Sequence, residues 1–143
     1  MPVEGRGTTA PLGGADIAGA VAFMSDALEK YTALAVATRA EGAALARLSV
    51  LAYSRIAPVV KEARPRPLDL YEAADRWRLR LVIFDATHEL VWPEHRLPWA
   101  ALAKAAKMRR ASYCEAHRCA TSVLQAALND GRREFHGRLF ARD

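Results

Sequence analysis

Apolar residues recur at helical spacing through most of this chain. From Asp16 onward they alternate in steps of four and three, at Ile17, Val21, Met24, Leu28, Tyr31, Ala35 and Thr38. Such a stripe covers one face of a helix and is also typical of the seam between two paired helices. We therefore expect a helix capped by Asp16, with a face suited to packing or to homodimerisation.

Residues 38–42 present a choice between a turn and one uninterrupted helix. Thr38 and Glu41 have the spacing of a capping box, and Gly42 weakens a helix. Uncapped helices beyond about 25 residues are uncommon, so we favour two helices forming an N-terminal pair over residues 16–63. The second helix should turn Leu45, Leu48, Ala52 and Ile56 inward, and Pro58 should kink it or end its regular part.

The middle of the chain predicts a third helix over residues 69–91. Residues 64–67, Arg-Pro-Arg-Pro, form a stiff connector, and Asp69 with Glu72 again has capping-box spacing. Helical spacing then joins Tyr71, Ala74, Trp77, Leu81, Phe84, His88 and Val91. A β-hairpin over residues 79–92 is the alternative, because the apolar block Leu-Val-Ile-Phe also fits a strand. The longer periodicity favours the helix.

Two further helices are expected at about residues 98–107 and 110–129. Pro98 suits the first turn of a helix, Gly131 supplies a stop, and residues 132–143 form a short helix or a tail. The aromatic residues Trp77, Phe84, Trp92 and Trp99 are most simply core, or alternatively anchors of a protein interface. The pattern as a whole predicts an all-α fold of about five helices. One domain covers residues 15–143, after a flexible leader at residues 1–14.

Positive charge is concentrated in the last third of the chain. The net charge is +5, yet residues 1–93 hold 11 Lys/Arg and 11 Asp/Glu, whereas residues 94–143 hold 10 and 5. Concentrated positive charge attracts nucleic acid, an anionic membrane or an acidic protein. The uncharged apolar stretches at residues 17–25 and 31–38 are too short to span a bilayer, so we expect no membrane segment.

One segment of this basic region suggests a function. From Leu102 the sequence reads LAKAAKMRRASYCEA. It resembles the helix-turn-helix of bacterial repressors, such as the headpieces of the lactose-repressor class, over residues 99–118. The pattern places small Ala103 where two helices cross, with Leu102, Ala106 and Met108 as the apolar contacts between them. Lys107 stands at the turn position that is normally glycine, and Ala116 at a late apolar position.

The resemblance implies a role for each polar residue of the segment. The recognition helix would open at Arg110, and its first residues would meet base edges. Arg109 and Arg110 could read guanine O6 and N7, and Lys104 and Lys107 would lie near phosphates. The implied DNA-binding residues are Lys104, Lys107, Arg109, Arg110, Ser112, Glu115 and Arg118, with Cys114 also facing the groove. The alternative is an ordinary amphipathic helix pair with a solvated basic face.

Other chemistry finds little support. Cys114 and Cys119 lie on different faces of one predicted helix, which disfavours a disulfide and fits reduced thiols in a cytoplasmic protein. Cys114 and His117 share a face, but without a second ligand pair we expect a structural thiol and a surface histidine. His88-Glu89-Leu90 with Pro93 resembles the phospho-acceptor box of sensor histidine kinases, but two prolines interrupt the helix it needs. We expect no catalytic residue, no metal and no cofactor.

These observations predict a small bacterial DNA-binding regulatory protein, sequence-specific or architectural. It would dimerise through residues 16–63 and contact DNA through the C-terminal segment. The alternative is a helical adaptor or inhibitor whose basic face binds an acidic partner protein. In either case the chain is not expected to be an enzyme.

Overall fold

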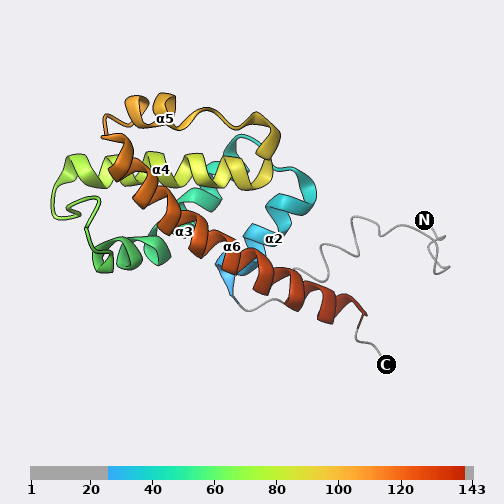
Figure 1. Ribbon diagram of the computed structural model, residues 1–143. Helices are drawn as coiled ribbons and strands as arrows, with labels where there is room; N and C mark the ends of the chain where they lie inside the picture. Colours follow the sequence, from blue (N-terminus) through green and yellow to red (C-terminus); the bar gives the residue numbers. More distant parts are fainter. Residues whose placement is uncertain (1–25, 141–143) are drawn as a thin grey trace.

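Five α-helices and one short 3-10 helix make up the described structure (Figure 1). The computed structural model describes the backbone of residues 26–140 and the side chains of residues 26–137. In chain order the elements are α2 (Ala27–Thr38), α3 (Ala43–Glu62), α4 (Ala73–Val91), η1 (Pro93–His95), α5 (Trp99–Ala105) and α6 (Arg110–Phe140). No strand occurs among these residues. The all-α fold is confirmed, and the hairpin over residues 79–92 is wrong.

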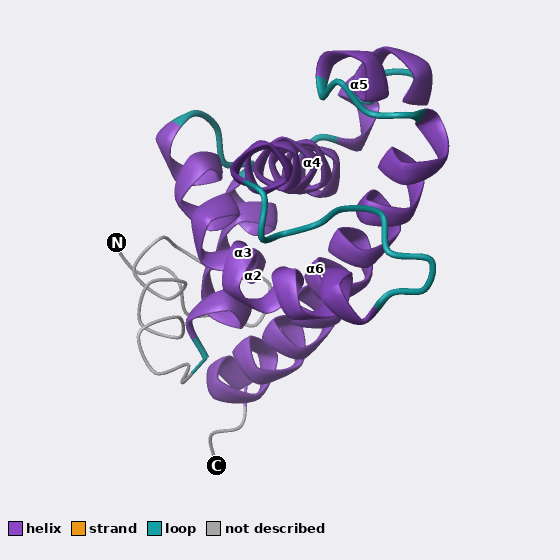
Figure 2. Ribbon diagram, turned by 90° about the vertical axis from the view of Figure 1, so that its left-hand side faces the viewer, coloured by secondary structure: helices purple, strands orange, loops and turns teal. Residues whose placement is uncertain are grey.

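The long helix α6 organises the fold. It runs diagonally through the molecule in Figure 1 and packs against α2, α3, α4 and α5. Its inward residues recur at helical spacing and are fully or almost fully buried: Tyr113, Ala116, Ala120, Leu124 and Ala127. Figure 2 shows α5 at the end of the molecule opposite the C-terminal end of α6. One hydrophobic cluster therefore links all the helices around α6.

The N-terminal pair consists of two separate helices, as predicted. Asp26 caps α2 by accepting a hydrogen bond from the Glu29 amide at 3.0 Å. The helix thus begins at Ala27, eleven residues after the predicted cap Asp16, which lies outside the described residues. Arg39 closes α2 in the left-handed conformation, with φ of 53°. The prediction of one helix continuing from Asp16 to Thr38 is wrong, because the backbone at Asp26 is extended and interrupts any helix there.

The connection between α2 and α3 differs from the predicted capping box. Thr38 is the last residue of α2, and its hydroxyl donates to the Leu34 carbonyl. Gly42, with φ of 54°, begins α3 without a side-chain cap. A positive φ is easy for glycine, which explains the turn without any capping side chain.

Helix α3 buries the predicted face. Leu45, Leu48, Ala52 and Ile56 are at most 2% exposed. Pro58 lies inside the helix, which continues to Glu62, so the prediction that Pro58 ends its regular part is wrong. Within the described residues, α3 alone is long and apolar enough to span a membrane by length and composition, a test that core helices of other proteins also pass.

Helix α4 begins later than predicted. Asp69 accepts a hydrogen bond from the Tyr71 amide, and its own amide donates to the Asp75 carboxylate. Asp69 therefore shapes a turn rather than capping the helix, which begins at Ala73 after Glu72. An Asp side chain that bonds the amide two residues ahead is a common alternative to a helix cap.

The buried face of α4 is not the predicted one. The buried stripe is Leu79, Val82, Ile83, Ala86, Thr87 and Val91. Of the predicted stripe only Val91 is buried, while Tyr71, Trp77 and Phe84 are exposed by 82%, 46% and 39%. Both stripes have helical spacing, so periodicity could not choose between them. The aromatic residues consequently divide: Trp92 and Trp99 pack partly buried against the core, and Trp77 and Phe84 do not belong to it.

Gly131 does not stop the last helix. Helix α6 continues through it to Phe140. A Cβ atom on Gly131 would lie 2.4 Å from the carbonyl oxygen of Glu29 in α2. The glycine therefore permits a close approach of two helices, and the predicted end near residue 129 is wrong.

Candidate nucleic-acid interface

The chain reverses direction sharply between α5 and α6. Lys107 has φ of 57°, in the left-handed region. Its amide donates to the Lys104 carbonyl at 3.0 Å, and the Met108 amide donates to the Ala103 carbonyl at 2.9 Å. This pair of bonds is the Schellman ending of a helix, which normally uses glycine at the left-handed position. A straight helix through Lys107 is therefore excluded, and Lys107 adopts the conformation of the glycine it replaces.

Small side chains hold α5 against its neighbours. Ala103 and Ala106 are 3% and 1% exposed, and Leu102 and Met108 pack partly buried against the core. Ala116, which the sequence marked as a weak apolar contact, is fully buried. The apolar side chains of this segment are therefore wholly or partly buried in the fold.

The predicted site residues divide into two groups by exposure. The exposed ones are Lys104, Lys107, Arg109, Arg110 and Arg118, and the partly buried ones are Ser112 and Glu115, together with Cys114. Arg118 donates from Nε to Oε1 of Glu115 at 3.2 Å. This hydrogen bond lowers the pKa of the Glu115 carboxyl. Lys104, Lys107, Arg109 and Arg110 thus lie on α5 or around the start of α6, at the end of the molecule where Figure 2 shows α5, and Arg118 occupies Glu115.

Four cations at this end have no acidic partner. Lys104, Lys107, Arg109 and Arg110 form no ion pair with any described residue, whereas Arg39, Arg55, Arg78 and Arg133 each pair with a carboxylate. The sequence explains the difference, because residues 95–114 contain no Asp or Glu. The turn between α5 and α6 therefore presents uncompensated positive charge.

Two of these cations, Arg109 and Arg110, lie at the positive end of a helix dipole. Arg110 is the first residue of α6, Arg109 precedes it, and the first turn contains no acidic residue. Helix N-termini favour negative charge, and cations there are destabilising. The arrangement weakens the free protein, but it strengthens attraction for an anion such as phosphate.

Two pairs of polar side chains lie between α6 and α4 below this turn. The Tyr113 hydroxyl donates to Oδ2 of Asp85 at 2.7 Å. One turn further, Nε2 of His117 lies 3.3 Å from Oε2 of Glu89, a close contact without hydrogen-bond geometry. His117 is 5% exposed, so its prediction as a surface histidine is wrong. Its Nδ1 lies 3.2 Å from the Thr121 hydroxyl, so both ring nitrogens have a polar neighbour.

Trp99 joins α5 to this cluster. Its ring meets His117 edge-on with centroids 4.6 Å apart, and Tyr113 at 5.9 Å. The Arg96 guanidinium lies over the Trp99 ring, 5.0 Å from its centroid. Aromatic contacts of this kind add to the burial of the rings, so the first residue of α5 is held against α6.

Burial shifts the ionisation of the buried groups. It lowers the pKa of His117 below its ordinary value, and Glu89 and Asp85 oppose that shift. It raises the pKa of Asp85, although the hydrogen bond from Tyr113 acts in the opposite direction. Burial also raises the pKa of Tyr113, with Asp85 contributing further. Burial thus disfavours both the imidazolium and the phenolate in this cluster.

An open groove of about 480 Å³ lies beside this cluster, lined by Glu89, Trp99, Cys114, His117, Arg118 and Ser122 among others. Cys114 and Cys119 are both free thiols. Among the described residues no three His, Cys, Asp or Glu side chains gather closely enough to hold a metal ion.

The sequence spacing is compatible with the buried polar contacts between α4 and α6, although the sequence analysis did not predict them. Asp85 and Glu89 are four residues apart on α4, and Tyr113 and His117 are four apart on α6. Residues four apart share a helix face, so two matched polar pairs can meet when two helices pack. Nothing in the sequence told which face of α4 would turn inward.

Comparisons with protein-family models, with curated proteins and with solved structures gave no significant match for this chain.

Proposed function

We propose that this protein binds DNA through the turn between α5 and α6. The observation that carries the proposal is the set of four exposed cations without an acidic partner, Lys104, Lys107, Arg109 and Arg110, at the N-terminus of α6. Phosphate contacts from Lys and Arg supply most of the non-specific affinity of DNA-binding proteins. A helix N-terminus flanked by such cations is suited to a phosphate.

Each cation would have its own role in the proposed complex. Lys104 and Lys107 precede α6 and would contact the DNA backbone. Arg109 and Arg110 would meet the major groove at the start of α6, where each could bind guanine in a bidentate manner. Arg118 lies two turns further along and is held by Glu115, so it would extend the contact along the same face.

Only the outer side of α6 is available for this contact. Tyr113, Ala116 and Ala120 face the core and are fully buried. Ser112 and Glu115 are partly buried, which leaves them at the edge of the contact rather than in its centre. A homodimer through residues 16–63 would present two such ends, as expected of a regulatory protein that binds paired half-sites.

A salt titration of duplex binding tests the proposal. The logarithm of the affinity should fall linearly with the logarithm of the salt concentration, by about 0.9 for each phosphate contacted. Replacing Arg109 and Arg110 together by Ala should abolish measurable binding. The matched control is Arg132→Ala with Arg133→Ala, an adjacent pair on the exposed side of the same helix. Absence of duplex binding by the wild-type chain at low salt would disprove the proposal.

A second candidate is an adaptor that binds another protein through exposed apolar residues. It is favoured by the exposure of Trp77, Phe84 and Leu97, by 46%, 39% and 57%. Exposed aromatic residues are typical anchors of protein interfaces. In that case a partner recovered by the wild-type chain should be lost with Trp77→Ala and Phe84→Ala, and duplex DNA should not compete for binding.

A further inference from the structure

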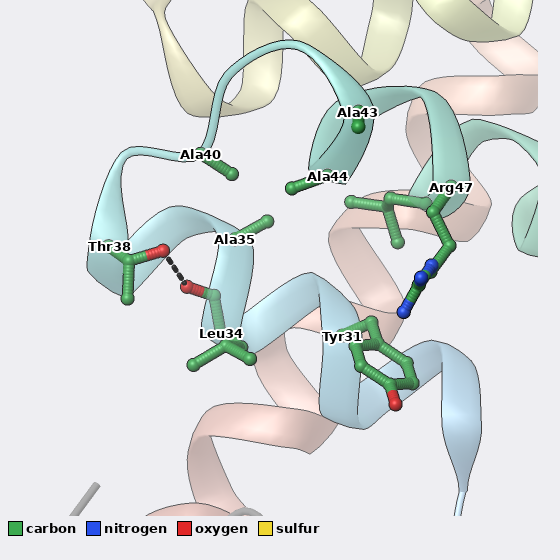
Figure 3. A pocket seen from close by; sticks show the side chains of 9 residues that line it. Tyr31, Leu34, Ala35, Thr38, Ala40, Ala43, Ala44 and Arg47 are labelled. Carbon is green, nitrogen blue, oxygen red and sulfur yellow. Dashed lines mark hydrogen bonds between the residues drawn. The ribbon is translucent and has the colours of Figure 1, made fainter. Parts of the chain in front are cut away.

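A hollow of about 310 Å³ lies between α2 and α3 (Figure 3). Its wall is formed largely by Leu34, Ala44 and Leu48, with further alanines near the turn that joins the two helices. Alanine side chains are short, so they leave space where the helices diverge. No aspartate or glutamate of the described residues lines the hollow.

Among the described residues, one charged side chain lines the hollow, that of Arg47. Thr38 also lines the hollow, but its hydroxyl already donates to the Leu34 carbonyl at 2.9 Å. Figure 3 shows the Arg47 side chain reaching from α3 toward the ring of Tyr31 in α2, whose hydroxyl points away from the alanines. Arg47 forms no ion pair with any described residue. An uncompensated guanidinium thus borders an apolar space.

We propose that this hollow binds a small monocarboxylate with an apolar body, whose carboxylate is held by Arg47. Charge complementarity selects the head group, because guanidinium binds carboxylate through two parallel hydrogen bonds. The apolar wall selects the body, and no carboxylate of the described residues lines the hollow to attract a cationic ligand. The site shares no residue with the basic turn, so it does not rest on the proposed DNA binding, but it lies within residues 16–63, so a bound ligand would compete there with the proposed homodimer contact.

The size of the hollow sets the size of the ligand. A volume of 310 Å³ equals the liquid volume of about ten water molecules, at roughly 30 Å³ each. A ligand of about ten non-hydrogen atoms fits this space, and it lies at the lower end of the usual range for ligand pockets. Octanoate has this size and serves as the probe.

Calorimetric titration of the full chain with octanoate tests the proposal. Octanoate should bind below its micelle-forming concentration, and 1-octanol should bind at least about tenfold more weakly, since it lacks the charge. Arg47→Gln should weaken octanoate binding by about tenfold or more. Lys61→Gln, which removes an exposed cation of the same helix away from the hollow, should leave it unchanged.

A second variant tests the proposal in case the Arg47 variant folds poorly. Ala44→Leu fills the hollow without altering charge, and leucine suits a helix nearly as well as alanine. It should abolish octanoate binding. Equal binding of octanol and octanoate, or unchanged binding by Arg47→Gln, would overturn the proposal. So would a dimer that Ala44→Leu disrupts while octanoate fails to bind, because the hollow would then be an interface between two copies.

Discussion

The hydroxyl of Tyr113 donates a hydrogen bond of 2.7 Å to the carboxylate of Asp85 and thereby fixes the start of α6 to α4. Tyr113 is fully buried, and it follows the exposed Arg110 by only three residues. The first turn of α6 therefore has one anchored side and one basic side. The position of the cations depends on this anchor.

Tyr113→Phe should destabilise the fold by about 1–3 kcal/mol, the usual cost of leaving a buried polar group without its partner. The ring still fills its space, so the loss isolates the hydrogen bond. Removal of the donor should also raise the pKa of Asp85 further, since the Tyr113 hydroxyl now lowers it. Urea unfolding at neutral pH measures the first effect, and NMR titration of the Asp85 carboxyl measures the second. An unchanged midpoint would show that the bond contributes nothing.

Lys107→Gly should stabilise the protein by about 0.5–1 kcal/mol. Lys107 has φ of 57°, a conformation that glycine adopts without strain. Lys104→Gly is the matched control, because it removes the same charge from within α5 and should destabilise by about the same amount. Thermal unfolding of both variants at one salt concentration separates backbone strain from charge. Equal changes of the unfolding temperature in the two variants would contradict the inference that the backbone of Lys107 is strained.

Gly131→Ala should destabilise the packing of α6 on α2 by about 1–3 kcal/mol, the usual cost of overpacking a close contact. The new Cβ would meet the Glu29 carbonyl oxygen at 2.4 Å, and a backbone atom cannot move aside easily. Gly137→Ala provides the comparison, because nothing lies within 4 Å of its Cβ position. That variant should gain about 0.5–1 kcal/mol from helix propensity. If both variants gained stability, the two helices would be farther apart than described.

Stability should fall as the pH drops below the ordinary histidine pKa of 6.5. The pKa of His117 is lower in the folded chain, so the unfolded chain takes up a proton first and is favoured. The stability that neutral His117 contributes is complete above pH 6.5 and is lost as the pH falls toward the pKa of His117 in the folded chain. Glu89, Asp85 and Arg96 face the ring and set how far the loss extends.

The variant His117→Gln tests this assignment. Its unfolding free energy should lack the slope contributed by one proton, at most about 1.4 kcal/mol per pH unit. Chemical denaturation at several pH values between neutrality and mild acid measures the slope in both proteins. Identical slopes would mean that other groups cause the acid sensitivity.

Much of the helix plan could be predicted from the sequence, because local signals coincide with the helices that formed. The turn near residue 39, the inward residues Leu45 and Ile56, and the break at Lys107 all follow from local periodicity and from neighbouring residue types. Helix starts were less predictable: Asp69 has the chemistry of a cap, but α4 begins after Glu72, and α2 begins after Asp26. Several capping residues compete along the chain, and packing selects among them.

The candidate site was predictable in part. Exposed charge at Lys104, Arg109 and Arg110 follows from a run without acidic residues. The buried pair His117 and Glu89 was not predicted, because each residue is usually exposed and only their meeting makes burial tolerable.

By itself, the sequence determined the helical class, the turns near residues 39 and 107, and the concentration of positive charge in the last third. These depend on residues close together in the chain. Only the tertiary structure decided which face of α4 is buried, because the stripe containing Phe84 and the stripe containing Ile83 have the same spacing. It also decided that Gly131 lies inside α6 against α2. A glycine can either end a helix in a turn or permit a close contact between two helices. The sequence alone does not say which, because the choice depends on whether a neighbouring helix packs against the glycine.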